Sequence, residues 1–427
     1  MNRGSPRQLK VGRAHTDKTA PLAVPLLFWL TGALGILMGL WRLTTVATLL
    51  LKGLTGAGGV LAAVHSFTLA GFTMLMMGAL YQLMPVLLNV APVSTSRVFI
   101  QWGVYTLGLI GFLLGLSTGT SGVLALGGVG VVLGIILFIG NVGERLWRRT
   151  TFNVTAWFFT SALAYLLLTV AMGGLLVLRY TTGHPSFPHE VAVHMTIALG
   201  GWFGLLVCGT SYRLWQMFGL KHQEPRYWLV TWGSVNGAII LWIIGLISGS
   251  EPVRAVGWFV QMVGFLTYVL AIFSAGMGDR RTMRDPFLRT LVLSMASLAV
   301  FEVLGTWAVA GHVDRLWIPA WIAYGLGWVG MSFLGFAQKI VPFMIWLHRY
   351  AHVHGQGKMP RLEDIWRPKL AYPPMGAVGM GIFMLLLSTA DASPLLFRLG
   401  AYLIGLGWLF FLGAGIRSVI GPHRKPE

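Results

Sequence analysis

The chain contains twelve separate apolar runs, and each is long enough to cross a lipid bilayer. A helix rises 1.5 Å per residue, so roughly 20 apolar residues span the hydrocarbon core. The sequence therefore predicts an all-α integral membrane protein. We expect twelve transmembrane helices, centred near Ile36, Leu75, Leu107, Leu133, Leu163, Leu205, Ile239, Val263, Met295, Gly330, Gly379 and Leu406.

Composition excludes a soluble globule, because 56% of the 427 residues are hydrophobic and only 10% are charged. No large water-soluble domain fits between the runs. The first run is too long for the apolar part of a secretory signal and lacks a small-residue cleavage site, so we expect it to be retained. The lone cysteine, Cys208, lies inside a predicted span and cannot form an intrachain disulfide.

Lysine and arginine predict the orientation. An even number of spans places both termini on one side, and that side and its loops carry 25 of the 31 basic residues. The other side carries six: Arg42, Lys52, Arg179, Arg254, Arg315 and Arg398. The positive-inside rule therefore predicts cytoplasmic tails at 1–21 and 420–427 around a membrane domain at 22–419, in the cell (plasma) membrane. A net charge of +18 spread over short loops also argues against a nucleic-acid partner and leaves the lipid bilayer as the expected one.

Glycine is frequent inside the spans. The chain has 56 glycines, about twice the usual ~7%. Pairs such as Gly111/Gly115 and Gly130/Gly134 have the spacing that lets two helix backbones approach closely in lipid. We expect a tightly packed bundle.

Spans two, six and ten share a sequence pattern. The words "GALYQLMPVL", "GTSYRLWQMF" and "GFAQKIVPFM" begin at Gly78, Gly209 and Gly335, 131 and 126 residues apart. A second glycine before an aromatic residue precedes each word, at Gly71-Phe72, Gly201-Trp202 and Gly327-Trp328. Recurrence every four spans predicts three four-helix units in a pseudo-threefold arrangement, at about 22–145, 150–278 and 285–419. After the last glycine of each word, we expect only a shared bend at the cytoplasmic end of the helix.

Histidines gather on the predicted outer side of the membrane. His65 and His194 lie inside spans two and six near their outer ends, and His189 and His312 lie at the outer mouths of spans six and ten. A lone histidine in a span is often a hydrogen-bonded core residue. Several at one depth on related helices favour a ligand set, because imidazole binds haem iron, copper and zinc. Candidate metal ligands are His65, His189 and His194.

Two carboxylates accompany these histidines. Glu190 stands four residues before His194, on the same helix face, where it is able to fix the tautomer of a metal-bound imidazole. Its position also suits the start of a helix, and the two roles are compatible. Glu302 is the one carboxylate well inside a span, which predicts either a role in a pathway or a protonated structural residue.

The stretch "VHSFTLAGFTMLMMGALYQLMP", which contains His65, resembles the second helix of the haem-copper oxidase superfamily, most closely its nitric oxide reductase branch. Twelve spans with a pseudo-threefold arrangement are also the plan of that family, which includes subunit I of cytochrome c oxidase. The resemblance implies that His65 ligates a low-spin haem from the outer side, with haem b as the expected cofactor. By its place in span six, His194 resembles the family's ligand to a non-haem metal, which makes copper the alternative metal.

The chain departs from the family in two helices. Span seven, "YWLVTWGSVNGAIILWIIGLI", has no histidine pair, and span ten, "WIPAWIAYGLGWVGMSFLGFAQKIVPF", has no histidine at all. A complete binuclear centre is therefore not expected, and whether the chain is an enzyme stays open. The resemblance implies a divergent haem-binding or copper-binding protein in electron transfer or gas-related redox chemistry. Its haem would lie between His65 and a second ligand, either His194 or His312.

Two other functions stay open. A membrane carrier or channel would use a path between the units past Glu302, Asn236 and Gln261, although transporter repeats are more often inverted pairs. A structural or assembly subunit would keep the oxidase scaffold without the metal chemistry. The expected partner is a redox protein if the chain binds haem or copper, and another membrane subunit if it is an assembly subunit.

Overall fold

The computed structural model describes residues 19–148, 153–184, 187–218, 226–276, 285–350 and 360–420. Over these residues, twelve helices are long and apolar enough to cross a membrane, and no β-strand is present. Each predicted span centre falls within one of the twelve, so the prediction of an all-α, multi-pass membrane protein is confirmed. Such helices require a lipid bilayer around them.

Nine spans are α-helical throughout the membrane: α1 (Ala23–Leu51), α4 (Thr95–Thr118), α5 (Ser121–Trp147), α6 (Val154–Thr182), α9 (Trp228–Ser248), α10 (Glu251–Gly276), α11 (Pro286–Gly311), α15 (Tyr372–Ala390) and α16 (Pro394–Ile420). The short helix α14 (Leu362–Ile365) and the 3₁₀ turn η8 (Pro368–Ala371) precede α15.

The other three spans are composite, because a π-helical segment interrupts each of them. Their pieces in chain order are α2 (Gly58–His65), η2 (Ser66–Thr73) and α3 (Met74–Leu88); α7 (Glu190–Thr196), η3 (Ile197–Gly204) and α8 (Leu205–Phe218); and, after the 3₁₀ turn η5 (Asp314–Leu316), α12 (Trp317–Ile322), η6 (Ala323–Gly330) and α13 (Met331–Arg349).

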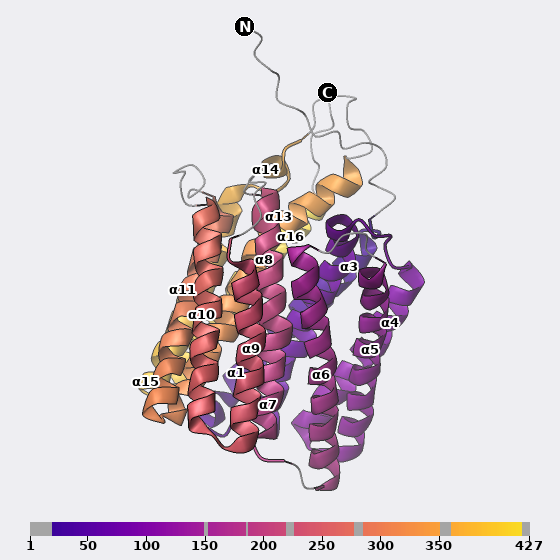
Figure 1. Cartoon of the computed structure of the whole chain (residues 1–427). Helices are drawn as coiled ribbons and strands as arrows, with labels where there is room; N and C mark the ends of the chain where they lie inside the picture. The colour runs from indigo at the N-terminus through magenta and orange to yellow at the C-terminus, as the bar shows by residue number, and fades with distance from the viewer. Residues whose placement is uncertain are drawn as a thin grey trace.

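The helices stand side by side in one bundle (Figure 1). Because the number of spans is even, α1 begins and α16 ends at the same end of the bundle, which we call the proximal end. The opposite, distal end carries the connections from α1 to α2, α6 to α7 and α11 to α12. The distal end is the predicted outer side, and His65 and His194 lie near it.

The π segments follow the spacing of the predicted repeat. Each begins 12 residues before the glycine that opens a repeat word: Ser66 before Gly78, Ile197 before Gly209 and Ala323 before Gly335. Each is also eight residues long. Spans two, six and ten therefore share a local structure as well as a sequence pattern. Their grouping into three four-helix units stays a prediction.

A π turn leaves the α-helical hydrogen-bond ladder out of register, so some carbonyl groups need other partners. In each π segment, one backbone carbonyl accepts a hydrogen bond from a hydroxyl group of another helix: Tyr105 Oη to Leu69 (3.0 Å), Tyr324 Oη to Leu199 (2.7 Å) and Ser294 Oγ to Trp328 (3.1 Å). Neighbouring helices thus hold each π segment in place.

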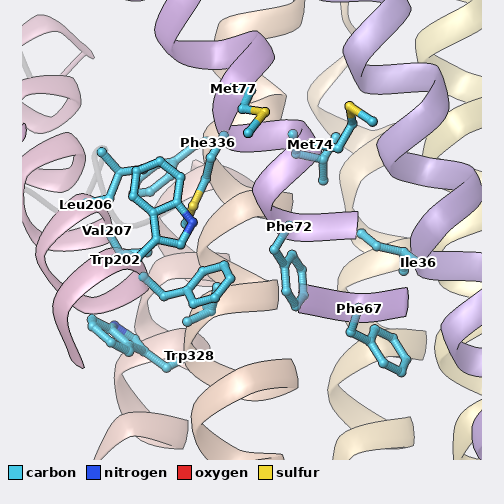
Figure 2. Packing of buried hydrophobic residues seen from close by; sticks show 14 of the residues in the cluster. Ile36, Phe67, Phe72, Met74, Met77, Trp202, Leu206, Val207, Trp328 and Phe336 are labelled. Atoms are coloured by element: carbon cyan, nitrogen blue, oxygen red, sulfur yellow. The ribbon is translucent and has the colours of Figure 1, made fainter. Parts of the chain in front are cut away.

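The three composite spans meet in the middle of the molecule. Trp202 Nε1 of η3 donates to Thr73 Oγ1 of η2 at 3.1 Å. The ring of Phe72 stacks on that of Phe333, with centroids 5.6 Å apart. Figure 2 shows Phe72, Trp202 and Trp328, one from each π segment, within the same apolar cluster. The central core is therefore built from the helices that carry the repeat.

Glycines bring α4 and α5 together, as the sequence predicts. A Cβ added at Gly134 would lie 2.6 Å from Cα of Tyr105, and one at Gly130 would lie 2.6 Å from Cα of Gly108. A Cβ at Gly127 would overlap the backbone of Phe112. Real side-chain atoms do not approach so closely, so these positions require glycine.

Gly127→Val is therefore expected to destabilise the protein by about 1–3 kcal/mol, because the added methyl groups push α4 and α5 apart. Gly140→Val on the same helix is the matched control, since no heavy atom lies within 4 Å of the position its Cβ would take. Thermal unfolding of the two purified variants in one detergent measures the difference. Equal unfolding temperatures for both variants would contradict the packing of α4 on α5.

Candidate functional site

His65 is the last residue of α2, directly before the π segment η2. Its Nδ1 lies 2.8 Å from the carbonyl oxygen of Leu61, one helical turn earlier. The ring meets Phe112 of α4 edge to face, with centroids 5.2 Å apart. When Nδ1 carries the proton and donates it to Leu61, Nε2 has a free lone pair. A metal-bound histidine commonly has this arrangement, with one nitrogen anchored and the other free.

His194 occupies a related place on α7, two residues before that helix ends and the π segment η3 begins. The ring packs against α6, because a Cβ added at Gly173 would lie 3.3 Å from its Cε1. It faces the Thr169 carbonyl, but the buried Nδ1 makes no hydrogen bond of acceptable geometry within the described part of the chain. A buried polar atom without a partner is costly and points to a missing ligand or donor.

Both imidazoles stand on helices that lead into π segments, and the hydrogen bond from Trp202 to Thr73 joins these two segments. Both are near the distal end, roughly 10 Å and 6 Å along their helices from the first residue. His65 and His194 therefore lie at a similar depth on two helices whose π segments are in contact, and their role as a ligand set stays a prediction.

A closed circuit of helices includes the two that carry these histidines. α2 packs against α4, α4 against α5, α5 against α6, and α6 against α7. The hydrogen bond from Trp202 to Thr73 then joins η3 back to η2. Since His65 contacts α4 and His194 contacts α6, both imidazoles lie against this circuit. Two separate helices thus contribute one imidazole each.

Glu190 has a different partner from the one that its spacing suggests. It is buried, with 5% of its surface exposed, and it forms an ion pair with Arg179 near the end of α6. Among the described residues, no hydrogen bond joins it to His194. Glu190 begins α7, so the ion pair ties the start of this helix to α6 and positions His194 indirectly.

The other distal histidines are exposed and stand apart. His189 precedes α7 with its side chain in solvent. His312 follows α11, with 67% of its side chain exposed, and its Nδ1 lies 3.8 Å from Oε1 of Glu251 on α10. Across the described ranges, no group of three or more histidine, cysteine, aspartate or glutamate side chains is close enough to hold a metal ion together. Of these candidate ligands, His65 and His194 are therefore the two that are at least half buried among the described helices.

A second polar pair lies between α10 and α11. Gln261 Nε2 donates to Oε1 of Glu302 at 3.3 Å. Asn236 instead donates to the carbonyl of Trp232 on its own helix, at 2.7 Å. The structure thus joins two of the three polar residues that the sequence associates with a transport path.

Tryptophans beside this pair were not recognised as site residues from the sequence. Trp317 and Trp321 lie on one helix face and, with Gln261, line a cavity of about 40 Å³. Their spacing of four residues was the available signal. Trp242 and Trp258 reach the same cavity from α9 and α10, and no spacing within one helix predicts that convergence.

The donor set of His65 and His194 fits a haem. Haem iron accepts histidine nitrogen as an axial ligand, and here α2 and α7 each present one half-buried imidazole near the distal end. The Nδ1 anchor of His65 suits that role, because it leaves Nε2 free to bind. Neither imidazole lines the 40 Å³ cavity or the larger apolar cavity at the centre of the bundle, so a macrocycle would enter by displacing side chains within the circuit.

No protein-family model matches the chain, and no curated protein is similar to it at a significant level. The functional proposal therefore depends on the site residues themselves.

Proposed function

We propose that this protein binds haem b between α2 and α7, with His65 and His194 as the two axial ligands. The observation that supports the proposal is the placement of one half-buried imidazole on each of α2 and α7 near the distal end, directly before two π segments that a hydrogen bond from Trp202 to Thr73 joins. His312 is the less favoured candidate for the second ligand, because its ring is exposed and lies beside Glu251 at the start of α10.

The chain's own residues prepare the site. The Leu61 carbonyl accepts the Nδ1 proton of His65, which directs Nε2 away from the helix and makes it a stronger donor. Phe112 holds the plane of that ring through its edge-to-face contact. The ion pair of Glu190 with Arg179 fixes the first turn of α7, on which His194 stands.

A bound haem would supply one-electron redox chemistry. We infer electron transfer or gas-related redox chemistry as the role, with a redox protein or another membrane subunit as partner. Copper is the alternative metal, since the same neutral imidazoles bind it. The absence of a histidine pair from span seven, and of any histidine from residues 317–343 of span ten, argues against a complete binuclear centre of the family type.

The test is a reduced-minus-oxidised absorbance spectrum of the purified protein, with metal analysis of the same sample. A Soret band with stoichiometric iron supports the proposal. Copper without haem supports the alternative metal. Colourless protein free of both metals, after expression with haem supplied, would overturn it.

A carrier or channel is the second candidate function. It is supported by the Gln261–Glu302 hydrogen bond, which places a carboxyl group beside a cavity within the membrane-spanning helices. An assembly subunit without metal chemistry is the third. Metal-free protein that moves a solute across a vesicle membrane would favour the carrier, and metal-free protein that copurifies with another membrane subunit would favour the third.

We propose the plasma membrane as the location, with both termini in the cytoplasm. The buried Cys208 is first replaced by serine, and a single cysteine is then introduced at Thr182 or at Glu363, both of which are exposed. A membrane-impermeant thiol reagent added to intact cells is expected to label position 182 and to spare position 363. The reverse pattern would contradict this orientation.

A further inference from the structure

An aromatic cavity lies in the distal half of the bundle, between α7/η3, α9, α10, α11 and α12. Six aromatic side chains line it: Trp242, Trp258, Phe301, Trp317, Trp321 and Tyr324. Trp317 is the first residue of α12, so the cavity reaches almost to the distal end. None of the residues proposed to hold haem takes part in its wall.

The aromatic rings form a continuous wall. Trp258 meets Trp317 edge to face at 5.5 Å, and Trp317 stacks on Trp321 at 5.6 Å between centroids. Phe301 closes the wall against Trp321 at 5.4 Å and against Tyr324 at 4.8 Å. Aromatic faces carry partial negative charge, so a cavity bounded by several of them favours a cation.

One edge of the cavity is polar. Gln261 lines it, and the amide group of Gln261 donates to Oε1 of Glu302 at 3.3 Å. An ionised carboxylate accepts hydrogen bonds only, so it orients the amide with Nε2 toward Glu302 and leaves Oε1 of Gln261 as an acceptor for another group. The second carboxyl oxygen, Oε2 of Glu302, is buried and has no hydrogen-bond partner in the described part of the chain.

Glu302 also lacks a cationic partner. No lysine, arginine or histidine of the described residues forms an ion pair with it. A carboxyl group at this depth either stays protonated or needs a positive charge from elsewhere. A cation in the neighbouring cavity would supply that charge.

The chemistry of the wall selects the kind of cation. Sodium, magnesium and calcium ions require several oxygen ligands, and the side chains that line the cavity offer three, those of Gln261, Thr196 and Tyr324. The hydroxyls of Thr196 and Tyr324 already donate to backbone carbonyls. Alkylated ammonium ions are weakly hydrated and bind well against aromatic faces. We propose that this cavity is a binding site for a small organic ammonium ion, with the rings around the cation and the Gln261–Glu302 pair as the negative pole.

The size of the cavity sets a limit on that ligand. Its volume is about 40 Å³, roughly three times the 10–15 Å³ that one water molecule requires. The cavity therefore suits a cationic head of a few heavy atoms, such as a methylated amine, rather than a large amphiphile. This inference stands whether or not the protein binds haem.

The test is equilibrium binding of radiolabelled tetramethylammonium to the full-length protein in lipid nanodiscs. We expect saturable binding at one site per chain. Unlabelled choline should compete, whereas its uncharged carbon analogue, 3,3-dimethyl-1-butanol, should not. Absence of saturable binding, equal competition by the neutral alcohol, or displacement by sodium at matched concentration and ionic strength would each overturn the proposal.

Four variants locate the site. Glu302→Gln keeps the shape of the side chain without its charge and is expected to weaken binding about tenfold or more, while Trp321→Leu should weaken it severalfold. Glu144→Gln is the matched control for charge, because Glu144 pairs with Arg97 on the surface. Trp147→Leu is the matched control for the ring, since 89% of Trp147 is exposed. Unchanged binding in both Glu302→Gln and Trp321→Leu would overturn the assignment of the site. If Glu302→Gln does not fold, Trp321→Leu and the competition assay still test the proposal.

Discussion

Replacing His65 with alanine is expected to abolish the haem spectrum while the protein still inserts into the membrane. The substitution removes an imidazole whose Nδ1 is already anchored, at 2.8 Å from the Leu61 carbonyl, with Nε2 left to bind iron. The fold should survive, because the loss of a partly buried hydrogen-bonding side chain costs only about 1–3 kcal/mol. The measurement is the reduced-minus-oxidised spectrum per mole of purified protein.

His348→Ala is the matched control for this variant. The Nδ1 of His348 lies 2.9 Å from the carbonyl oxygen of Met344, so it has the same i to i−4 anchor as His65, but at the proximal end. The control should retain the haem. An unaltered spectrum in His65→Ala would show that the imidazole serves only as a core hydrogen-bonding residue.

Replacing His194 with alanine is expected to leave the haem bound but with only one axial histidine. The iron should change from a low-spin to a high-spin spectrum and acquire the ability to bind carbon monoxide, because the vacated position becomes accessible to an external ligand. Absorbance spectra of the reduced protein, with and without carbon monoxide, measure both changes.

His312→Ala distinguishes the two candidates for the second ligand. His312 is exposed and lies beside Glu251, so its removal should leave the spectrum unchanged. A high-spin spectrum in His312→Ala, together with an unaltered one in His194→Ala, would reverse the assignment. Loss of haem from both His65→Ala and His194→Ala would still identify the same pair of ligands.

The candidate site shows which features a local sequence pattern predicts and which it does not. His65 and His194 stand out because imidazoles are rare inside apolar runs, and that rarity is visible in the sequence. The partner of Glu190 is less predictable. Its spacing of four residues from His194 predicts a contact along one helix, but the carboxylate pairs with Arg179 across the α6–α7 boundary. A side chain in a helix bundle has neighbours on its own helix and on adjacent helices. Sequence spacing describes only the neighbours on its own helix.

The twelve spans and their approximate centres follow from the sequence alone, because the thickness of the bilayer and the need to satisfy backbone groups within it set the length of each apolar helix. The close packing of α4 on α5 through Gly130 and Gly134 is predictable for a similar reason, since only small residues let helix backbones approach in lipid.

The tertiary structure alone decides which helix faces meet. Apolar residues cover every side of a membrane helix, so hydropathy carries almost no information about the direction in which a given side chain points. The π segments depend on hydroxyl groups from other helices, such as Tyr324 donating to Leu199 across 125 positions in the chain. The convergence of four tryptophans on the cavity beside Gln261 and the contact of His65 with Phe112 likewise arise from the packing of separate helices.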